Sequence, residues 1–352
     1  MSKNNHVLSD TQIKAFMQRA LDLAQLGAGN VSPNPMVGCV IVHQGKIIGE
    51  GWHQRYGHWH AEVNAVADVK DQSLLPESDV FVTLEPCSHF GKTPPCADLL
   101  VKHQVRRVYI CNDDPNPLVA GKGIQKLRDA GIEVISSVLE EKGRVLNRRF
   151  FTFFEKKRPY IILKWAESTD GKIALPNFQA VQISNALSRR WTHQLRSEED
   201  AIMVGTRTAQ YDNPSLNTRF WTGKNPTRVL IDKHLQVAKD SAIYAGTTPT
   251  ICYNSIKSEQ KGHISYVQME AENSWLPMIL DDLYQRKIQS VIVEGGTALL
   301  QSCIDAGLWD EAYRWISPQA IGEGITAPTL TEGLIDRKEI GDNSLWRYSI
   351  EQ

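Results

Sequence analysis

The sequence lacks several features that would point away from an ordinary globular protein. It has no apolar run long enough to span a membrane, and its first ten residues are polar, without the apolar core of a signal peptide. Six cysteines in 352 residues are too few for a disulfide scaffold. We therefore expect a cytoplasmic protein with no membrane partner, whose cysteines serve as thiols, buried apolar residues or metal ligands.

The chain also lacks an excess of charge of either sign. Its 39 lysines and arginines nearly balance its 40 aspartates and glutamates. This balance argues against a nucleic-acid partner, which would require a basic surface. The glycine motif G-x-G-x-x-G of the common dinucleotide-binding fold does not occur. Whether the chain forms a homo-oligomer stays open at this stage.

Two successive α/β patterns are present, and a chain of this length favours two domains. Between Arg144 and Pro159 the sequence is aromatic and basic and shows no clean period. We place the junction near Phe154 to Arg158, which divides the chain into domains 1–150 and 158–352. The four phenylalanines of this segment are expected to pack between the domains rather than bind a ligand.

Apolar periodicity predicts the main elements of both domains. In the first we expect an α/β sandwich, with helices over 11–26, 60–69, 95–102 and 123–130 and strands over 37–42, 46–49, 80–84, 107–111 and 132–135. In the second we expect strands over 160–165, 201–204, 228–231, 250–253 and 290–293, with helices over 184–196, 275–286 and onward from 297.

The strongest chemical signal is a metal-ligand pattern. His60-Ala61-Glu62 is followed by Pro86-Cys87 and, after eight intervening residues, by Cys96. One imidazole and two thiolates suit a catalytic zinc with its fourth position left for water, whose pKa zinc lowers. His60 and Cys96 fall at predicted helix starts, where the helix dipole favours a thiolate. Glu62 is placed to shuttle the proton of that water without being a ligand.

This pattern is close to the H-x-E and P-C-x-x-C signature of zinc nucleobase deaminases. It departs in one respect, because eight residues instead of two separate the cysteines, and we interpret that segment as a loop over the substrate. The alternatives are ordinary thiols beside a surface histidine, and a structural zinc, which would need a fourth protein ligand. The other four cysteines are expected to be buried in the cores.

Longer motifs extend this interpretation to a known family. SPNPMVGCVIV, GEGWH, HAEVNA, EPCSHFGKTPPC and DPNP in the first half, with KWAESTDGKIA, LRSEEDAIMVGTRTAQYDNPSLNTR and VEGGTALL in the second, resemble the bifunctional riboflavin-biosynthesis deaminase/reductase. The resemblance runs to about Gly322. It implies a cytidine-deaminase-like α/β/α sandwich followed by a dihydrofolate-reductase-like α/β domain.

The resemblance also implies two reactions on a phosphorylated pyrimidine. The first domain would deaminate 2,5-diamino-6-(5-phosphoribosylamino)pyrimidin-4-one with one zinc per chain. The second would use NADPH to reduce the ribosyl group to a ribityl chain. Deaminase substrate contacts would come from residues of the matching motifs, namely Asn34, His53, His89, Lys92, Asp114 and Asn116. Asn34, between two prolines, is also a natural turn residue, and the segment from Asp114 to Pro117 is also a natural loop.

For the reductase the resemblance implies contacts of two kinds. Cofactor contacts would be Ala166, Thr208, Asp212, Gly295, Gly296, Thr297, Ala298 and Leu299. Substrate contacts would be Arg196, Leu216, Arg219 and Glu294. The strand, glycine pair and helix start over 290–297 offer backbone N–H groups to a pyrophosphate, although the same pattern also serves as a simple connection. Trp165, Glu167 and Gln182 depart from what is common in the family at these positions.

Two other functions compete with this interpretation. One is a nucleoside or RNA deaminase fused to an unrelated α/β domain, which a basic groove would favour. The other is a zinc module without activity that positions a reductase, which the presence of Glu62 disfavours.

Overall fold

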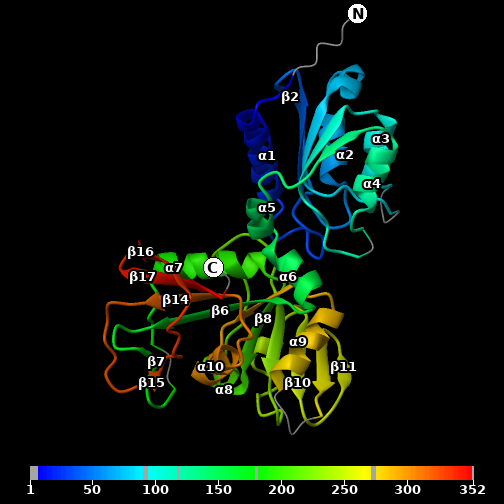
Figure 1. The fold of residues 1–352 in the computed structure, drawn as a ribbon. Coiled ribbons are helices and arrows are strands. Elements are labelled where there is room, and N and C mark those ends of the chain that lie inside the picture. The colour runs from blue at the N-terminus through cyan, green and yellow to red at the C-terminus, as the bar shows by residue number, and fades with distance from the viewer. Residues whose placement is uncertain (1–6, 90–93, 118, 179–180, 271–274, 351–352) are drawn as a thin grey trace, which may run out of the picture. The chain divides into compact units, whose positions relative to one another are not determined.

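The chain folds into two compact units, Met1–Lys156 and Lys157–Gln352. The computed structural model describes residues 7–89, 94–117, 119–178, 181–270 and 275–350 (Figure 1). Each unit contains its own sheet and its own buried core.

The first unit is built around a five-stranded sheet with the order β2-β1-β3-β4-β5. Strand β1 is antiparallel to β2 and β3, whereas β3, β4 and β5 are parallel. Its elements are α1 (Asp10–Gln25), β1 (Gly38–His43), β2 (Lys46–Trp52), α2 (Ala61–Asp68), a 3-10 helix (Gln72–Glu77), β3 (Asp79–Leu84), α3 (Cys96–Lys102), β4 (Arg107–Asn112), α4 (Lys122–Asp129), β5 (Glu133–Ile135), α5 (Glu140–Leu146) and α6 (Arg148–Lys156).

Alternation along the strands gives this sheet two buried faces, because successive side chains of a strand point to opposite sides. Val40, Phe81 and Tyr109 pack with the buried side chains of α1. Their neighbours Ile41 and Val80 pack on the other face with residues of α2, α3 and α4. Figure 1 shows α1 on one side of the sheet and these three helices on the other. The predicted α/β/α sandwich is therefore confirmed.

Close helix packing places the start of α2 beside the sheet. A Cβ atom added to Gly51 of β2 would lie 2.3 Å from the backbone nitrogen of Ala65 in α2. Only glycine admits this approach without moving the helix. The start of α2 is where His60 and Glu62 lie, so this contact helps to set the depth of those side chains.

The second unit contains a ten-stranded sheet with the order β11-β12-β10-β9-β8-β13-β6-β14-β17-β16. The run from β12 to β14 is parallel, and β11, β17 and β16 are antiparallel to their neighbours. Its elements are β6 (Tyr160–Glu167), β7 (Lys172–Ala174), α7 (Ala186–Glu198), β8 (Ala201–Gly205), α8 (Thr206–Tyr211), β9 (Thr227–Ile231), a 3-10 helix (Ala242–Tyr244), β10 (Thr250–Asn254), β11 (Glu259–Lys261), β12 (Ile264–Gln268), α9 (Trp275–Gln285), β13 (Ser290–Val293), α10 (Thr297–Asp305), β14 (Glu311–Ile316), β15 (Ile325–Thr326), β16 (Leu334–Ile340) and β17 (Asn343–Ser349).

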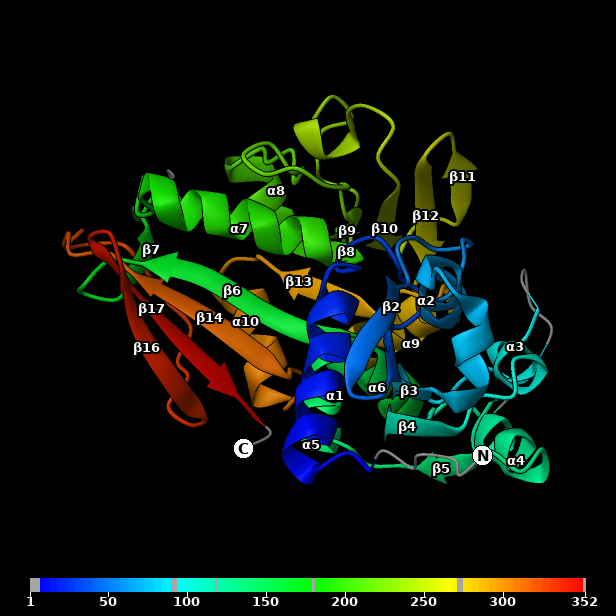
Figure 2. The same cartoon turned by 90° about the horizontal axis from the view of Figure 1, so that it is seen from above.

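Helices cover both faces of this sheet as well. Ile162 of β6 packs with Leu195 of α7, whereas the adjacent Leu163 packs with Leu300 of α10. The two views show α7 and α10 on opposite sides of β6 (Figures 1 and 2). In sheets of this kind, ligands bind beyond the carboxyl ends of the parallel strands.

Several elements differ from the sequence prediction. The segment without a clean period contains the end of α5 and the whole of α6, and the buried Phe150, Phe151 and Phe153 lie on α6. The prediction also omitted α8, β7, β11, β12 and the strands after α10. Strand β16 was not predicted because its side chains are mostly exposed and polar, so its sequence shows no apolar alternation.

All six cysteines are free thiols, as expected. Within the described part of the chain, no helix has the length and apolar character needed to cross a bilayer.

Candidate active sites

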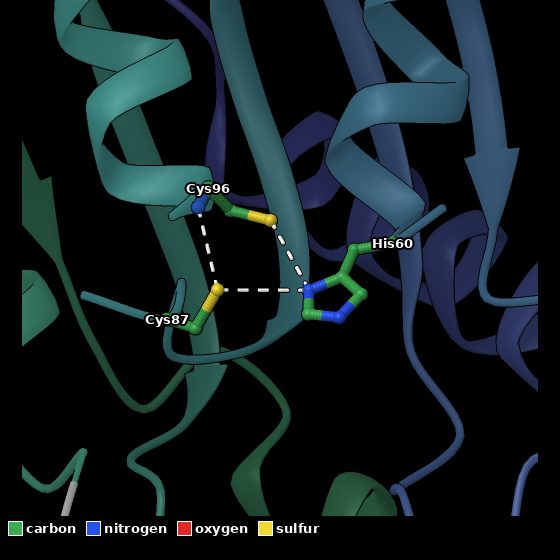
Figure 3. Close-up of side chains that lie close together, drawn as sticks. All are labelled: His60, Cys87 and Cys96. Carbon is green, nitrogen blue, oxygen red and sulfur yellow. Dashed lines mark hydrogen bonds between the residues drawn. The ribbon is translucent and has the colours of Figure 1, made fainter. Parts of the chain in front are cut away.

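Three predicted metal ligands meet at the end of β3 in the first unit. His60 is the residue before α2, Cys87 lies in the loop after β3, and Cys96 opens α3. Figure 3 shows their side chains pointing toward one another from these separate segments. Cys87 follows His60 by 27 positions in the chain and Cys96 follows it by 36, so the fold brings distant residues into one cluster.

The spacing of the ligand atoms suits a tetrahedral zinc ion. His60 Nδ1 lies 3.6 Å from Cys87 Sγ and 3.4 Å from Cys96 Sγ. Zinc bonds of usual length at tetrahedral angles place a nitrogen and a sulfur ligand roughly 3.6 Å apart. Among the described residues no fourth side chain joins the group, as a catalytic site with an open position requires and a closed structural site does not.

The cluster favours the ionised form of one thiol. The pKa of Cys87 is lowered to about 4, chiefly because the Cys96 thiol and His60 hydrogen-bond to its sulfur. The backbone N–H of Cys96, at the start of α3, donates to the same sulfur over 3.3 Å. The pKa of Cys96 is raised correspondingly. A thiolate already stabilised by its surroundings is the form that binds a metal.

Glu62 lies beside this cluster in the first turn of α2. Its side chain is buried, and burial raises the pKa of its carboxyl, with the charge on Cys87 adding to the effect. A raised pKa makes the carboxylate a better acceptor for a proton, which the resulting acid can then pass on. Its position fits the predicted role of proton shuttle.

A cavity of about 300 Å³ opens onto the cluster. Besides His60, Glu62 and Cys87, it is lined by every predicted deaminase contact that the structure describes, namely Asn34, His53, His89, Asp114 and Asn116. Lys92, the remaining predicted contact, lies outside the described residues. The structure thus brings together residues from five separate motifs.

Hydrogen bonds fix the orientation of the His53 ring and of the Asn34 amide. The buried His53 faces the carbonyl oxygen of Trp59 with Nδ1, at 3.0 Å, and the Asn34 amide nitrogen with Nε2, at 3.2 Å. Burial lowers the pKa of His53, which favours a neutral ring that donates from Nδ1 and accepts from Asn34.

Burial also raises the pKa of Asp114 to about 6.

Some cavity residues were missed by sequence reasoning. Phe150 and Phe154 line the cavity, whereas the sequence assigned them to packing between domains. Helix α6 explains the difference, because residues four apart lie on one face of a helix. Tyr56 and His58 also line the cavity, and their nearness to the HAE motif in the sequence was the available signal.

The second unit holds a larger cavity of about 660 Å³ at the carboxyl ends of β6, β8 and β13. All eight predicted cofactor contacts line it, as does Glu294. Helix α10 begins there behind Gly296, which has no side chain to cap the first N–H groups of the helix. Such a helix start suits the pyrophosphate of a dinucleotide.

A buried charge cluster adjoins this cavity, which Glu294 and Lys164 line. Arg196 donates two hydrogen bonds of 2.8 Å to Glu294, and the ammonium of Lys164 lies 3.8 Å from the same carboxylate. Although burial alone would raise it, the pKa of Glu294 is lowered to about 2 by Arg196 and Lys164. Lys164 was missed, although a lysine within the apolar run of β6 was a signal for it.

The other predicted substrate contacts lie away from the cavity lining. Arg196 reaches it through Glu294, and its guanidinium also donates to the carbonyl oxygen of Asn217. Leu216 is buried in a core cluster with Ile202 and Val204. Arg219 is exposed, and its backbone N–H donates to His193 Nδ1.

The three unusual positions are accommodated in two ways. The indole N–H of Trp165 donates to Glu167, which also accepts from Arg314 on the neighbouring strand β14. The buried carboxylate is thereby paired on both oxygens. Trp165 and Gln182 line the cavity.

Comparisons with known proteins agree with this geometry. Residues 10–112 match the cytidine and deoxycytidylate deaminase zinc-binding region, and residues 159–349 match the RibD C-terminal domain. The riboflavin biosynthesis protein RibD of Aquifex aeolicus is 40% identical over 321 residues, which cover 89% of each chain. That of Actinobacillus pleuropneumoniae is 38% identical over 87% of this chain and 84% of its own.

Solved structures are similar over nearly the whole chain. A diaminohydroxyphosphoribosylaminopyrimidine deaminase/5-amino-6-(5-phosphoribosylamino)uracil reductase of Thermotoga maritima has a TM-score of 0.88 at 34% identity and covers 97% of this chain and 99% of its own. RibD of Acinetobacter baumannii has a TM-score of 0.89 at 30% identity, with 98% and 100% covered.

Fold and sites together define a class of protein, a zinc-dependent deaminase joined to an NADPH-dependent reductase. The chain belongs to the RibD family of bifunctional deaminase/reductases of riboflavin biosynthesis. An RNA or nucleoside deaminase fused to an unrelated domain is not favoured, because the second half matches the RibD C-terminal domain.

Proposed function

We propose that residues 1–150 hydrolyse an amine of 2,5-diamino-6-(5-phosphoribosylamino)pyrimidin-4-one and that residues 158–352 then reduce the ribosyl group of the product to a ribityl chain. The observation that carries the first assignment is the convergence of His60, Cys87 and Cys96 on one point beside a buried Glu62. The Thermotoga maritima relative is a deaminase of diaminohydroxyphosphoribosylaminopyrimidine, which supports the choice of pyrimidine.

In the deamination, His60, Cys87 and Cys96 would hold one zinc, which when bound supplies a water of lowered pKa. Glu62 takes one proton of the attacking water and delivers it to the ring nitrogen, and it then passes the second proton of that water to the departing amine. The carbon gains the oxygen of water as its bond to nitrogen breaks, and ammonia leaves.

The remaining cavity residues would bind the pyrimidine and its substituents. The side-chain amides of Asn34 and Asn116 and the carboxyl of Asp114 supply donors and acceptors for its polar edge. His53 fixes the orientation of Asn34, since their hydrogen bond occupies the amide nitrogen. His89 lines the cavity, and we assign it and Lys92 to the substrate as well.

In the reduction, NADPH would supply the hydride. Gly295, Gly296, Thr297, Ala298 and Leu299 at the start of α10 would bind its pyrophosphate, with Ala166, Thr208 and Asp212 as further contacts. Glu294 lines the cavity and is paired with Arg196, and we assign this pair to the sugar phosphate side of the substrate. The substrate contacts assigned to Leu216 and Arg219 stay predictions, as do a cytoplasmic location and a homo-oligomer.

One experiment tests the assignment directly. Zinc-loaded protein is supplied with the diaminopyrimidinone ribotide, with and without NADPH, and the products are identified by mass. Without NADPH we expect a product in which oxygen replaces an amine, and with NADPH the same product with two further hydrogens. An unchanged ribotide in both reactions would refute the proposed substrate.

A further inference from the structure

Glu85, the first residue of the EPCSHFGKTPPC motif, is a buried carboxylate at the cavity to which no role has been assigned above. It follows β3, two residues before Cys87, and its side chain is 3% exposed. Both of its oxygens accept backbone N–H groups from a segment far along the chain. Oε1 accepts from Gly123 at 2.8 Å and Ile124 at 3.3 Å, and Oε2 accepts from Gly121 at 2.9 Å and Asp114 at 3.4 Å.

Three of these donors belong to the start of α4. The first N–H groups of a helix have no partner within it and are usually satisfied by a side chain just before the helix. Here that position is Gly121, which has no side chain to supply. Glu85 satisfies these groups from another segment, and its negative charge is favourable at the positive end of the helix dipole.

The start of α4 and the loop after β3 form a junction, which a close backbone contact also holds together. A Cβ atom added to Gly123 would lie 1.9 Å from the carbonyl oxygen of Pro86. The start of α4 is therefore pressed against the segment that runs directly into Cys87. An alanine at position 123 would have to push the two segments apart.

The fourth donor extends this junction to the substrate cavity. Asp114, whose N–H donates to Glu85, accepts the N–H of Asn116 with its own carboxylate at 2.8 Å. Both side chains line the cavity beside the zinc ligands. The two ends of the segment 114–121 are thus tied to one carboxylate.

We propose that Glu85 is a positioning residue for the deamination, which holds Asp114 and Asn116 at their distance from the His60, Cys87 and Cys96 cluster. The proposal rests on the proposed function, because it assigns Asp114 and Asn116 to the pyrimidine. Its effect is exerted through substrate binding and not through the metal or through Glu62.

The test uses the full-length, zinc-loaded protein with Glu85→Gln. The amide group can accept on one side only and turns a donor toward the remaining N–H groups. We expect KM for the ribotide to rise about tenfold or more, the scale set by lost hydrogen bonds to a charged group. We expect kcat to change less than KM, and the zinc content to stay at one per chain.

Two further variants separate positioning from general loss of structure. Asp79→Asn removes a buried carboxylate at the other end of the same strand, where Asp79 binds Arg106 away from the cavity. It should lower stability while KM stays within about twofold, because it is remote from the cavity. Gly123→Ala should raise KM as Glu85→Gln does, since it opens the same junction.

A double variant and hydrogen exchange complete the test. In an Asp114→Ala background, Glu85→Gln should raise KM by a smaller factor than in the wild type, because the Asp114 carboxylate that it helps to position is already absent. Faster amide exchange at Asp114, Gly121, Gly123 and Ile124 should accompany Glu85→Gln. Unchanged exchange, or faster exchange with an unchanged KM, would overturn the proposal. If the wild-type protein failed to deaminate the ribotide, the proposed function would fail first, while exchange would still report whether Glu85 anchors the segment.

Discussion

The two cavities of this protein are formed by different kinds of residue position, and the sequence reveals the two kinds differently. The cavity of the first unit surrounds three ligand atoms with strict distance requirements, and its key residues sit in short motifs. The cavity of the second unit collects the carboxyl ends of β6, β8 and β13 with the start of α10. A metal site restricts which residue types can occupy a position, whereas a dinucleotide cavity is largely formed by backbone and shape.

This difference matches where the structure places the two sets of predicted contacts. Every predicted substrate contact of the deaminase that the structure describes lines one cavity. In the second set the backbone-rich positions line the cavity, but the side chains of Arg196, Leu216 and Arg219 do not. Long side chains reach over several ångströms, so their targets depend on the packing around them and not on the position of their own residue.

The largest expected effect separates the two cavities through the metal. Cys87→Ala and Cys96→Ala should each lose zinc, and deamination should fall to the limit of detection, because three ligands are the least that a catalytic zinc site uses. Reduction of the already deaminated substrate should continue. Metal analysis and separate assays of both activities check this. Stoichiometric zinc in either variant would contradict the ligand assignment.

The next effect separates proton transfer from metal binding. Glu62→Gln should keep zinc while deamination falls about 10²- to 10⁴-fold, the usual contribution of a positioned acid or base. Glu77→Gln, an exposed carboxylate of the same unit, is the matched control and should be silent. If Glu62→Gln also abolished reduction of the deaminated substrate in folded, zinc-loaded protein, the two sites would have to be coupled.

The corresponding change in the second unit is Arg196→Ala. It leaves the carboxylate of Glu294 without its main partner, and breaking such a buried pair costs about 3–5 kcal/mol of unfolding free energy. Reduction should be impaired and deamination spared, as judged from NADPH oxidation and ammonia release. Arg196→Met combined with Glu294→Leu should recover stability without recovering reduction. Recovered reduction would show that the pair has no part in that activity.

The smallest effect concerns the pH dependence of stability in the second unit. His193 accepts the backbone N–H of Arg219, and burial lowers its pKa to about 4. An unfolded histidine titrates near 6.5, so between these values the unfolded chain binds more protons. The free energy of unfolding should therefore decrease as pH falls from about 6.5 toward 4.

His193→Gln keeps an acceptor that does not titrate. The variant should lose less stability over this pH range than the wild type, which denaturant unfolding at both ends of the range would show. An equal loss in both proteins would assign the acid sensitivity to other groups.

Sequence reasoning reached most of the regular elements, but not those whose pattern was ambiguous. The aromatic run that became α6 carries phenylalanines at positions one, three and four apart, which suit a helix face as well as an irregular linker. The exposed strand β16 has no apolar alternation to reveal it. The role of Glu85 could not be predicted, although the residue lies in a motif whose cysteine was recognised as a ligand. An anchoring carboxylate is recognised only when the positions of its four N–H partners are known.

The sequence by itself determined the chemistry of the first site, because zinc accepts few ligand types and the spacing of His60, Cys87 and Cys96 is characteristic. It also determined the buried strands, since their apolar residues can be stable only inside a sheet covered by helices. Only the tertiary structure decided which side chains face each cavity and which carboxylates act as anchors. Those roles depend on contacts between segments far apart in the chain, where a difference of a few ångströms separates a ligand contact from a core residue.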